Sequence, residues 1–279
     1  MKLAFSTNAF TRTSLKQAII EIGNAGYSGV EILADVPHAF PPNPRAEWVQ
    51  ECKHLLQWNK LSISNINANT AGGFFSDPTG EPTFEPSLCN SNRETRKKRI
   101  HYTKQCMELA AELGAGNISI TSGSCLPGNP PRQALHYLQE SLKEILEHAE
   151  KSGINVGVEY EPGLLIENAE ELLHLIEVMG SDRLGVNLDL GHSVVIGEET
   201  GEIIQRFGKR IWNIHLEDID QRKHYHLIPG EGTIDFLKIA NELRDIEYQG
   251  FVTIELYTYA NDPVHAAKQS LSYLQPFFQ

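Results

Sequence analysis

Short apolar runs alternate along the whole chain with longer segments in which apolar residues recur every three or four positions. The short runs are typical of buried strands, and the longer periodicity is typical of amphipathic helices, as between Leu135 and Ala149. The pattern predicts eight strand–helix rounds. The expected strands are Leu3–Thr7, Gly29–Leu33, Ser62–Asn67, Asn117–Thr121, Asn155–Tyr160, Gly185–Asp189, Trp212–Leu216 and Phe251–Leu256.

Glycines fall at the junctions where a predicted helix must end and the chain turn back into a strand. They are Gly26, Gly114, Gly116, Gly153, Gly180 and Gly250. Regular alternation of this kind predicts a parallel sheet covered by helices, either open and doubly wound or closed into a (β/α)8 TIM barrel. An open sheet would favour a glycine-rich phosphate loop after an early strand, but Ser6 to Ala9 carries neither a GxGxxG nor a Walker pattern. We therefore expect one closed barrel domain spanning 1–279.

One connection departs from this compact rhythm. Residues 72–92 combine Gly, Pro, Ser, Asn and Asp with Phe74, Phe75 and Phe84, and they are too many for a plain connector. Because this segment follows a strand, it is expected over the C-terminal mouth of the barrel, as a lid, an oligomer contact or a surface excursion.

Composition narrows the function classes. A net charge of −12 and a pI near 5.4 disfavour binding to nucleic acid, which requires a surplus of basic residues. The four cysteines form no CxxC pair, so a thiolate zinc site and a disulfide framework are not expected. The first residues show neither a signal peptide nor a membrane span. These features predict a cytoplasmic protein that does not associate with membranes.

Candidate chemistry lies on the last four predicted strands, each of which carries a charged or imidazole side chain near its end. These residues are Glu159, Asp189, His215 and Glu255. A lone acidic residue there often caps a helix or pairs with a basic residue, but four in successive rounds favour convergence on a shared cation. Three carboxylates and one imidazole suit one divalent metal ion, namely Mn2+, Mg2+, Co2+ or Zn2+. Glu161 lies on the same strand face as Glu159; Glu159 is preferred as the ligand because it directly follows the apolar run.

The motifs GYSGVEI, VEYEPG, LDLGH, HLED, PGEG and TIELY together resemble the xylose isomerase-like TIM barrel superfamily over nearly the whole chain. That superfamily contains sugar isomerases and epimerases as well as apurinic endonuclease family 2. The resemblance implies that Glu159, Asp189, His215 and Glu255 are metal ligands. It also places His192 and His226 near the substrate or a second metal. Glu161 is expected to contact the substrate or hold a loop.

The expected reaction is proton transfer beside a metal-chelated carbonyl of a small-molecule sugar or polyol, phosphorylated or not. Glu159 and Glu255 could flank the reacting carbon, one removing the proton and the other returning it. Return to the opposite face would epimerise the carbon, whereas return to the neighbouring carbon would isomerise the sugar. A dehydratase of a keto-inositol would share the first step and then lose water.

An endonuclease-like hydrolase is disfavoured, because repair enzymes of this superfamily carry further histidines on the third and fourth strands. Here those strand ends read Asn65-Ile66-Asn67 and Thr121-Ser122-Gly123. Asn67 is instead expected to bind a sugar hydroxyl or to cap its own loop. Arg222 and Lys223, after the seventh strand, could meet an anion or only water. A homo-oligomer is compatible with the sequence.

Overall fold

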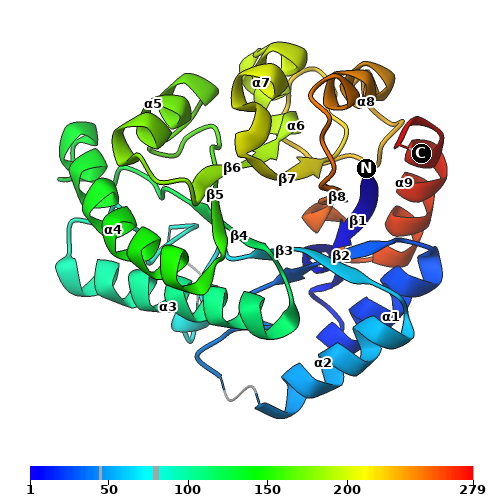
Figure 1. Ribbon diagram of the computed structural model, residues 1–279, viewed down its shortest axis with the longest axis horizontal. Coiled ribbons are helices and arrows are strands. Elements are labelled where there is room, and N and C mark those ends of the chain that lie inside the picture. The colour runs from blue at the N-terminus through cyan, green and yellow to red at the C-terminus, as the bar shows by residue number, and fades with distance from the viewer. Residues whose placement is uncertain (44–45, 78–81, 279) are drawn as a thin grey trace.

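The computed structural model describes residues 1–43, 46–77 and 82–278. Eight parallel strands pair in chain order and close into a barrel, and helices surround this ring (Figure 1). This is the predicted (β/α)8 TIM barrel. The strands are β1 (Lys2–Ser6), β2 (Gly29–Leu33), β3 (Ser62–Asn67), β4 (Asn117–Thr121), β5 (Asn155–Glu159), β6 (Leu184–Asp189), β7 (Ile211–Leu216) and β8 (Phe251–Ile254). The α-helices are α1 (Leu15–Ala25), α2 (Ala46–Trp58), α3 (Arg93–Leu113), α4 (Pro131–Ser152), α5 (Ala169–Met179), α6 (Leu190–Ile196), α7 (Thr200–Phe207), α8 (Phe236–Asp245) and α9 (Pro263–Phe278). Short 3-10 turns are η1 (Thr7–Phe10), η2 (Gly72–Phe74), η3 (Gly208–Arg210) and η4 (Tyr257–Tyr259).

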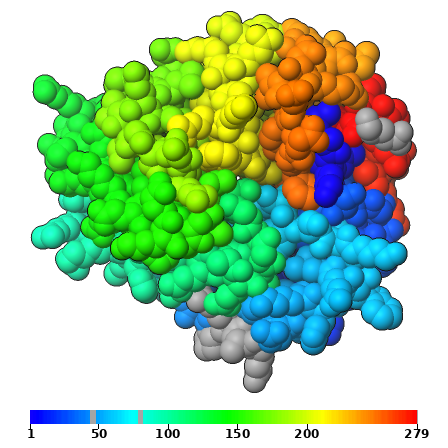
Figure 2. Space-filling view, in the orientation of Figure 1, coloured from blue at the N-terminus to red at the C-terminus, as the bar shows by residue number. Residues whose placement is uncertain are grey.

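Closure depends on pairing between the first and the last strand. Lys2 to Phe5 of β1 pair in parallel with Phe251 to Ile254 of β8. The space-filling view shows the same closure at the surface, where the blue N-terminal residues lie between orange and red segments from the end of the chain (Figure 2). None of the eight described strands has an exposed edge, and the C-terminal end of each points toward the same mouth.

The helices begin and end where the local sequence dictates. Asn168 accepts a hydrogen bond from the backbone N–H of Glu171 and so caps the start of α5. Gly114, Gly153 and Gly180 follow α3, α4 and α5 with positive φ, which a glycine adopts without a steric penalty. These three predicted junctions therefore mark real helix ends.

Three strands end one or two residues before the expected bounds, and β1, β6 and β7 each begin one residue earlier than expected. Thr7 begins η1 instead of ending β1, Tyr160 follows β5, and Glu255 and Leu256 follow β8. Glu255 is therefore the first residue after β8, and its backbone N–H donates to Leu216 O of β7 at 3.2 Å. The paired segments of the strands themselves lie where the apolar runs predict them.

The barrel interior contains a chain of polar contacts beneath the mouth. The Thr253 hydroxyl lies 3.0 Å from Ser64 Oγ and 2.9 Å from Asn213 Oδ1, and the Asn213 amide donates to Asn187 Oδ1 at 2.8 Å. These buried groups satisfy one another, as polar groups out of contact with water must. Because Asn187 Oδ1 accepts from Asn213 below it, the NH2 group of Asn187 points toward the mouth of the barrel.

Among the described residues, no helix is both long and apolar enough to cross a membrane.

Candidate metal centre and active site

The four candidate ligands converge at the C-terminal mouth. Glu159 ends β5, Asp189 ends β6, His215 lies on β7 and Glu255 follows β8. One potential ligand atom from each lies within 4.8 Å of those of the other three, and all four residues are buried. His215 Nδ1 is central to this group, at 2.9 Å from Glu159 Oε2 and 3.6 Å from Glu255 Oε2.

Glu31 on β2 lies on the opposite side of the His215 ring. Its Oε2 is 2.6 Å from His215 Nε2, and both side chains are fully buried. The Asn65 amide donates to the same oxygen at 2.8 Å, and the Asn67 amide donates to Oε1 at 3.1 Å. Burial alone would raise the pKa of Glu31, but the His215 charge and these hydrogen bonds lower it overall. Glu31 is therefore a buried carboxylate held beside the imidazole.

Glu255 is oriented by two amides from the first half of the barrel. Its Oε1 accepts a hydrogen bond from Asn8 at 2.8 Å and another from Asn67 at 3.0 Å. Asn67 thus bridges Glu31 and Glu255, while its Oδ1 accepts from the Asn69 backbone N–H at 3.2 Å. Asn67 therefore caps its own loop, which is one of the two roles expected for it. Its amide nitrogen donates hydrogen bonds to the carboxylates of Glu31 and Glu255.

Asp189 has a second acidic neighbour behind it. Its Oδ1 accepts from the His192 backbone N–H at 2.9 Å, which caps α6. Glu217 is fully buried beside Asp189, and burial followed by the Asp189 charge raises the Glu217 pKa well above its ordinary value. Gly191 leaves room for this carboxyl group, because a Cβ there would lie 1.5 Å from Glu217 Oε1. This explains the glycine of the DLGH motif.

Three imidazoles form the adjoining wall of the site. His192 Nε2 is 3.0 Å from His224 Nε2, and His226 Nε2 is 3.3 Å from the same atom. The outer nitrogens of the two buried rings are used by backbone carbonyls: His192 Nδ1 contacts Tyr160 O at 3.0 Å, and His226 Nδ1 contacts Glu255 O at 2.8 Å. Both rings therefore present Nε2 toward His224. Burial lowers the His226 pKa to about 4.

The loop that carries His224 and His226 is fastened by Asp218. This carboxylate accepts hydrogen bonds from four backbone N–H groups, two of them in the PGEG segment; the donors are Ile219, Gly230, Gly232 and Ile234. Gly230 has a φ of +99°, and a Cβ at Gly232 would lie 2.4 Å from Asp218 Oδ1. The PGEG glycines are thus required by the close approach of backbone to carboxylate.

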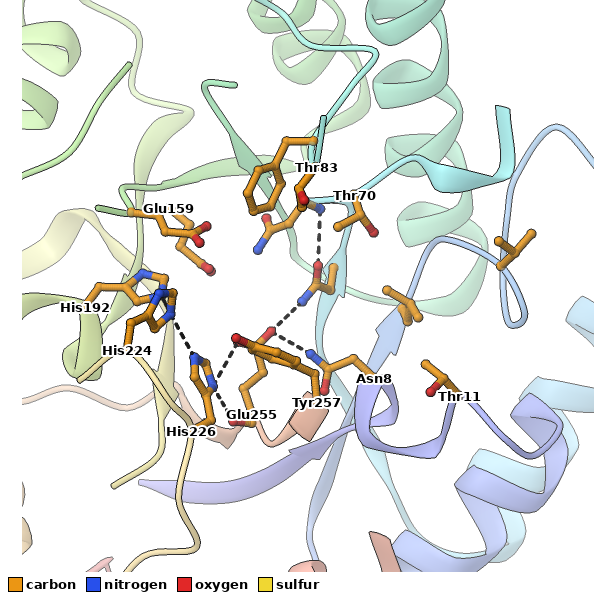
Figure 3. Close-up of a pocket in the computed structure, with 16 residues that line it drawn as sticks. Asn8, Thr11, Thr70, Thr83, Glu159, His192, His224, His226, Glu255 and Tyr257 are labelled. Carbon is orange, nitrogen blue, oxygen red and sulfur yellow. Dashed lines mark hydrogen bonds and ion pairs between the residues drawn. The ribbon is translucent and has the colours of Figure 1, made fainter. Parts of the chain in front are cut away.

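A cavity of about 580 Å³ opens above these groups. Glu159, His192 and His224 lie on one side of it, and Thr11, Thr70 and Thr83 lie across from them (Figure 3). The remaining lining residues are Asn8, Leu33, Val36, Asn67, Asn69, Phe84, Glu161, His226, Glu255 and Tyr257. Glu161 is the third carboxylate of the lining, and burial raises its pKa to about 7. Glu159 and Glu161 therefore both face the cavity, but only Glu159 belongs to the four-residue group around His215.

The segment 72–92 contributes Thr83 and Phe84 to the cavity wall, and residues 78–81 of it lie outside the described part. Its base is held by buried Arg99, whose guanidinium donates to the backbone carbonyls of Asn69 at 2.9 Å and Ala68 at 2.5 Å. Arg222 and Lys223 do not line the cavity; the Arg222 guanidinium donates to Val195 O at 3.0 Å.

The donor set fits a divalent cation. Glu31, Glu159, Asp189 and Glu255 surround a single imidazole, and among described residues no lysine or arginine forms an ion pair with any of them. Buried carboxylates at such distances repel one another unless a proton or a cation is shared between them. Burial, partly opposed by the His215 charge, accordingly raises the Glu255 pKa well above its usual range. Hard oxygen ligands with one nitrogen are a normal site for the four metals expected.

Sequence reasoning missed Glu31, Asn8, Glu217 and His224. Glu31 had a recognisable signal, since it interrupts the apolar strand run of GVEIL, where an unpaired charge is costly. Glu217 and His224 are each two residues from a residue that was singled out, yet their roles depend on the loop path. Asn8 lies in a 3-10 turn that the strand pattern does not predict.

Comparison with known proteins places this architecture in a family. The family model described as xylose isomerase-like TIM barrel matches residues 20–277. The chain belongs to this family. It is 28% identical over 276 residues to fructoselysine 3-epimerase of Escherichia coli O157:H7, covering 97% of this chain and 96% of that protein. Inosose dehydratase of Lacticaseibacillus casei is 23% identical over 261 residues, with 87% and 82% covered.

A solved structure shares the fold over its full length. The crystal structure of the IOLI protein with a zinc atom superposes with a TM-score of 0.80, 18% identity and complete coverage of both chains. These two relatives are named as an epimerase and a dehydratase, and the IOLI structure holds a zinc atom.

Proposed function

We propose that this protein is a divalent-metal-dependent epimerase or isomerase of an unphosphorylated ketose or ketose derivative. The observation that carries the proposal is the convergence of Glu159, Asp189, His215 and Glu255 within 4.8 Å of one another, beside a cavity that Glu159 and Glu255 line. The similarity to fructoselysine 3-epimerase over 97% of the chain supports the reaction class.

In this proposal the four residues hold the ion, which would polarise the carbonyl and adjacent hydroxyl oxygens of the substrate and acidify the C–H bond between them. Glu159 and Glu255 both line the cavity and approach His215 Nδ1 from different strands. One carboxylate takes the proton as the C–H bond breaks, and the electron pair moves toward the carbonyl oxygen. The other returns a proton to the opposite face, which inverts the carbon.

The lining of the cavity supports an uncharged substrate. It contains three glutamates and three histidines, and no lysine or arginine of the described residues. A phosphate would be placed near carboxylates without a cationic partner, which is unfavourable. His192, His226 and Glu161 are proposed to contact substrate hydroxyls, and Leu33, Val36 and Phe84 offer an apolar wall to a substituent at the far end of the sugar.

The test is exchange of substrate protons with solvent. Protein treated with chelator and then reloaded with Mn2+, Co2+, Mg2+ or Zn2+ is incubated in D2O with fructoselysine, other unphosphorylated ketoses and their phosphorylated counterparts. We expect metal-dependent deuterium incorporation beside the carbonyl, together with the epimer, only for unphosphorylated compounds. No exchange with any metal across this panel would refute the proposal.

The roles of the two glutamates can be separated from metal binding. Glu159→Gln and Glu255→Gln preserve side-chain shape, and metal content is measured beside exchange. With metal retained, each variant should exchange the proton of one epimer at least 100-fold faster than that of the other, because one acid–base group survives. Equal loss with both epimers in metal-loaded protein would argue against two opposed carboxylates.

The inosose dehydratase relative supplies the alternative reaction. A product lighter by one water, formed from an inosose without epimer accumulation, would favour a dehydratase. Mass spectrometry of the same incubations distinguishes the two outcomes.

A further inference from the structure

His215 has two ring nitrogens, and they face different surroundings. Nδ1 points to the ligand group, at 2.9 Å from Glu159 Oε2 and 3.6 Å from Glu255 Oε2. Nε2 points away from that group to Glu31 Oε2, at 2.6 Å. A carboxylate only accepts hydrogen bonds, so Nε2 carries a proton in that contact. By the same rule Nδ1 carries a proton toward Glu159 in the metal-free protein, and a cation held by the ligand group would take the place of that proton.

A second contact lies on the Nδ1 side of the ring. The Asn187 amide nitrogen lies 3.1 Å from His215 Nδ1. Its orientation is fixed from below, because Asn187 Oδ1 accepts from the Asn213 amide, whose own Oδ1 accepts from the Thr253 hydroxyl. Asn187 therefore presents its N–H groups to Glu159 Oε2, to which it donates, and to the Nδ1 side of the ring, so that Nδ1 stays directed at the ligand group.

We propose that Glu31 is a positioning residue that fixes His215 in the Nε2–H tautomer, so that His215 binds the metal through Nδ1. The inference rests on the proposed metal site, although the hydrogen bond itself does not. Glu31 reaches no ligand other than His215 directly, and it does not line the cavity. Its action on the reaction is therefore through the imidazole.

Glu31 is also well placed to hold the ring still. Asn65 and Asn67 donate to its two oxygens, and Asn67 also donates to Glu255. The orientation of the histidine ligand and that of a carboxylate ligand are thereby set by one connected group of side chains on β2 and β3. Partners of this kind typically change metal affinity 10- to 100-fold when they are removed.

The first test needs no variant. Protein with 15N-labelled histidine is examined by long-range 1H–15N NMR, metal-free and with diamagnetic Zn2+. We expect the His215 Nε2 proton in both states and Zn2+-induced perturbation at Nδ1. A Zn2+-loaded His215 with its proton on Nδ1 would overturn the inference.

The second test measures Zn2+ and Mn2+ affinity by calorimetry for Glu31→Gln and Glu31→Ala. Both should bind about 10- to 100-fold more weakly than the wild type, with the larger loss for Glu31→Ala, because Gln keeps one acceptor oxygen. Tyr248→Phe serves as the matched control, since it removes a part-buried hydrogen bond at the start of β8, to Phe251 O at 2.9 Å, without touching Glu31 or the ligand group. Its affinity should stay within about threefold of the wild type.

The outcomes separate the two proposals. Wild-type protein that binds no divalent ion would defeat the proposed function, while the Nε2–H contact to Glu31 could still be read by NMR in metal-free protein. Wild-type binding with unchanged affinity in Glu31→Ala would defeat the role of Glu31 and leave the metal site intact. Should Glu31→Ala fail to fold, the metal affinity of Glu31→Gln and the His215 tautomer in the wild type still test the role of Glu31.

Discussion

The two halves of the barrel contribute differently to the same mouth. Strands β5 to β8 end in the groups that converge as potential ligands, whereas β2, β3 and the turn after β1 provide Glu31, Asn67 and Asn8, which hold those groups by hydrogen bonds. The second or ligand half supplies the proposed ligands, and the first or supporting half, which includes the Glu31 carboxylate, sets their direction. A site of this kind needs both halves, since ligands that are free to rotate lose affinity and geometry.

The largest expected effect comes from the ligand half. Asp189→Asn should weaken divalent-metal binding by more than about 100-fold, because a charged ligand is replaced by a neutral amide. The Asn oxygen can still cap α6, so folding should persist. Calorimetry and circular dichroism measure the two properties, and Asp182→Asn, at an exposed surface ion pair, is the control. Unchanged affinity would remove Asp189 from the metal site.

Metal removal should distinguish the halves directly. At a free metal concentration of 1,000 times Kd, binding should stabilise the fold by about 4 kcal/mol relative to chelator-treated protein. Hydrogen exchange should slow more at the ends of β5 to β8 than at those of β1, β3 and β4, since the ion joins the former. Uniform protection around the ring would contradict the division.

A smaller effect is expected from the supporting half at Asn67. Asn67→Ala removes donors from both Glu31 and Glu255, which should cost about 1–3 kcal/mol of stability. Metal affinity should fall about 10-fold as Glu255 gains freedom. Urea denaturation and calorimetry measure these changes, and affinity equal to the wild type would confine Asn67 to a loop-capping role.

Asn117 tests how far from the ligands the supporting group of side chains extends. Its amide donates to Asn65 Oδ1 at 2.8 Å and to Ser64 O at 3.2 Å, one contact further from the ligands. Asn117→Ala should cost about 1 kcal/mol of stability. Metal affinity should remain within about twofold of the wild type, and a loss as large as that of Asn67→Ala would extend the support deeper into the barrel.

The smallest effect is expected outside both halves. Arg222→Ala and Lys223→Ala should leave exchange kinetics with unphosphorylated ketoses unchanged within about twofold, because neither side chain lines the cavity. Stability should change by less than about 0.5 kcal/mol at these exposed positions. A selective rise in KM for an anionic substrate would show that this loop meets the substrate's charge.

The sequence predicts the barrel well because the same alternation of an apolar strand and an amphipathic helix recurs eight times along the chain. Apolar runs locate β2, β3 and β4 to the residue, and the charged strand ends identify the four residues that converge. Side-chain direction is less accessible. Asn67 was expected to face a sugar or its own loop, and its contact with Glu255 joins residues 188 positions apart. Glu31 meets His215 only because the barrel closes, and His224 meets His192 only because of the path of the loop after β7.

The four hydrogen bonds of Asp218 have an evolutionary consequence. They secure the span between β7 and α8 through main-chain groups, so the side chains at 220–223 can vary without loosening the anchor. Exchanging that short stretch between homologues should therefore change substrate specificity while the barrel fold and the four carboxylates stay in place.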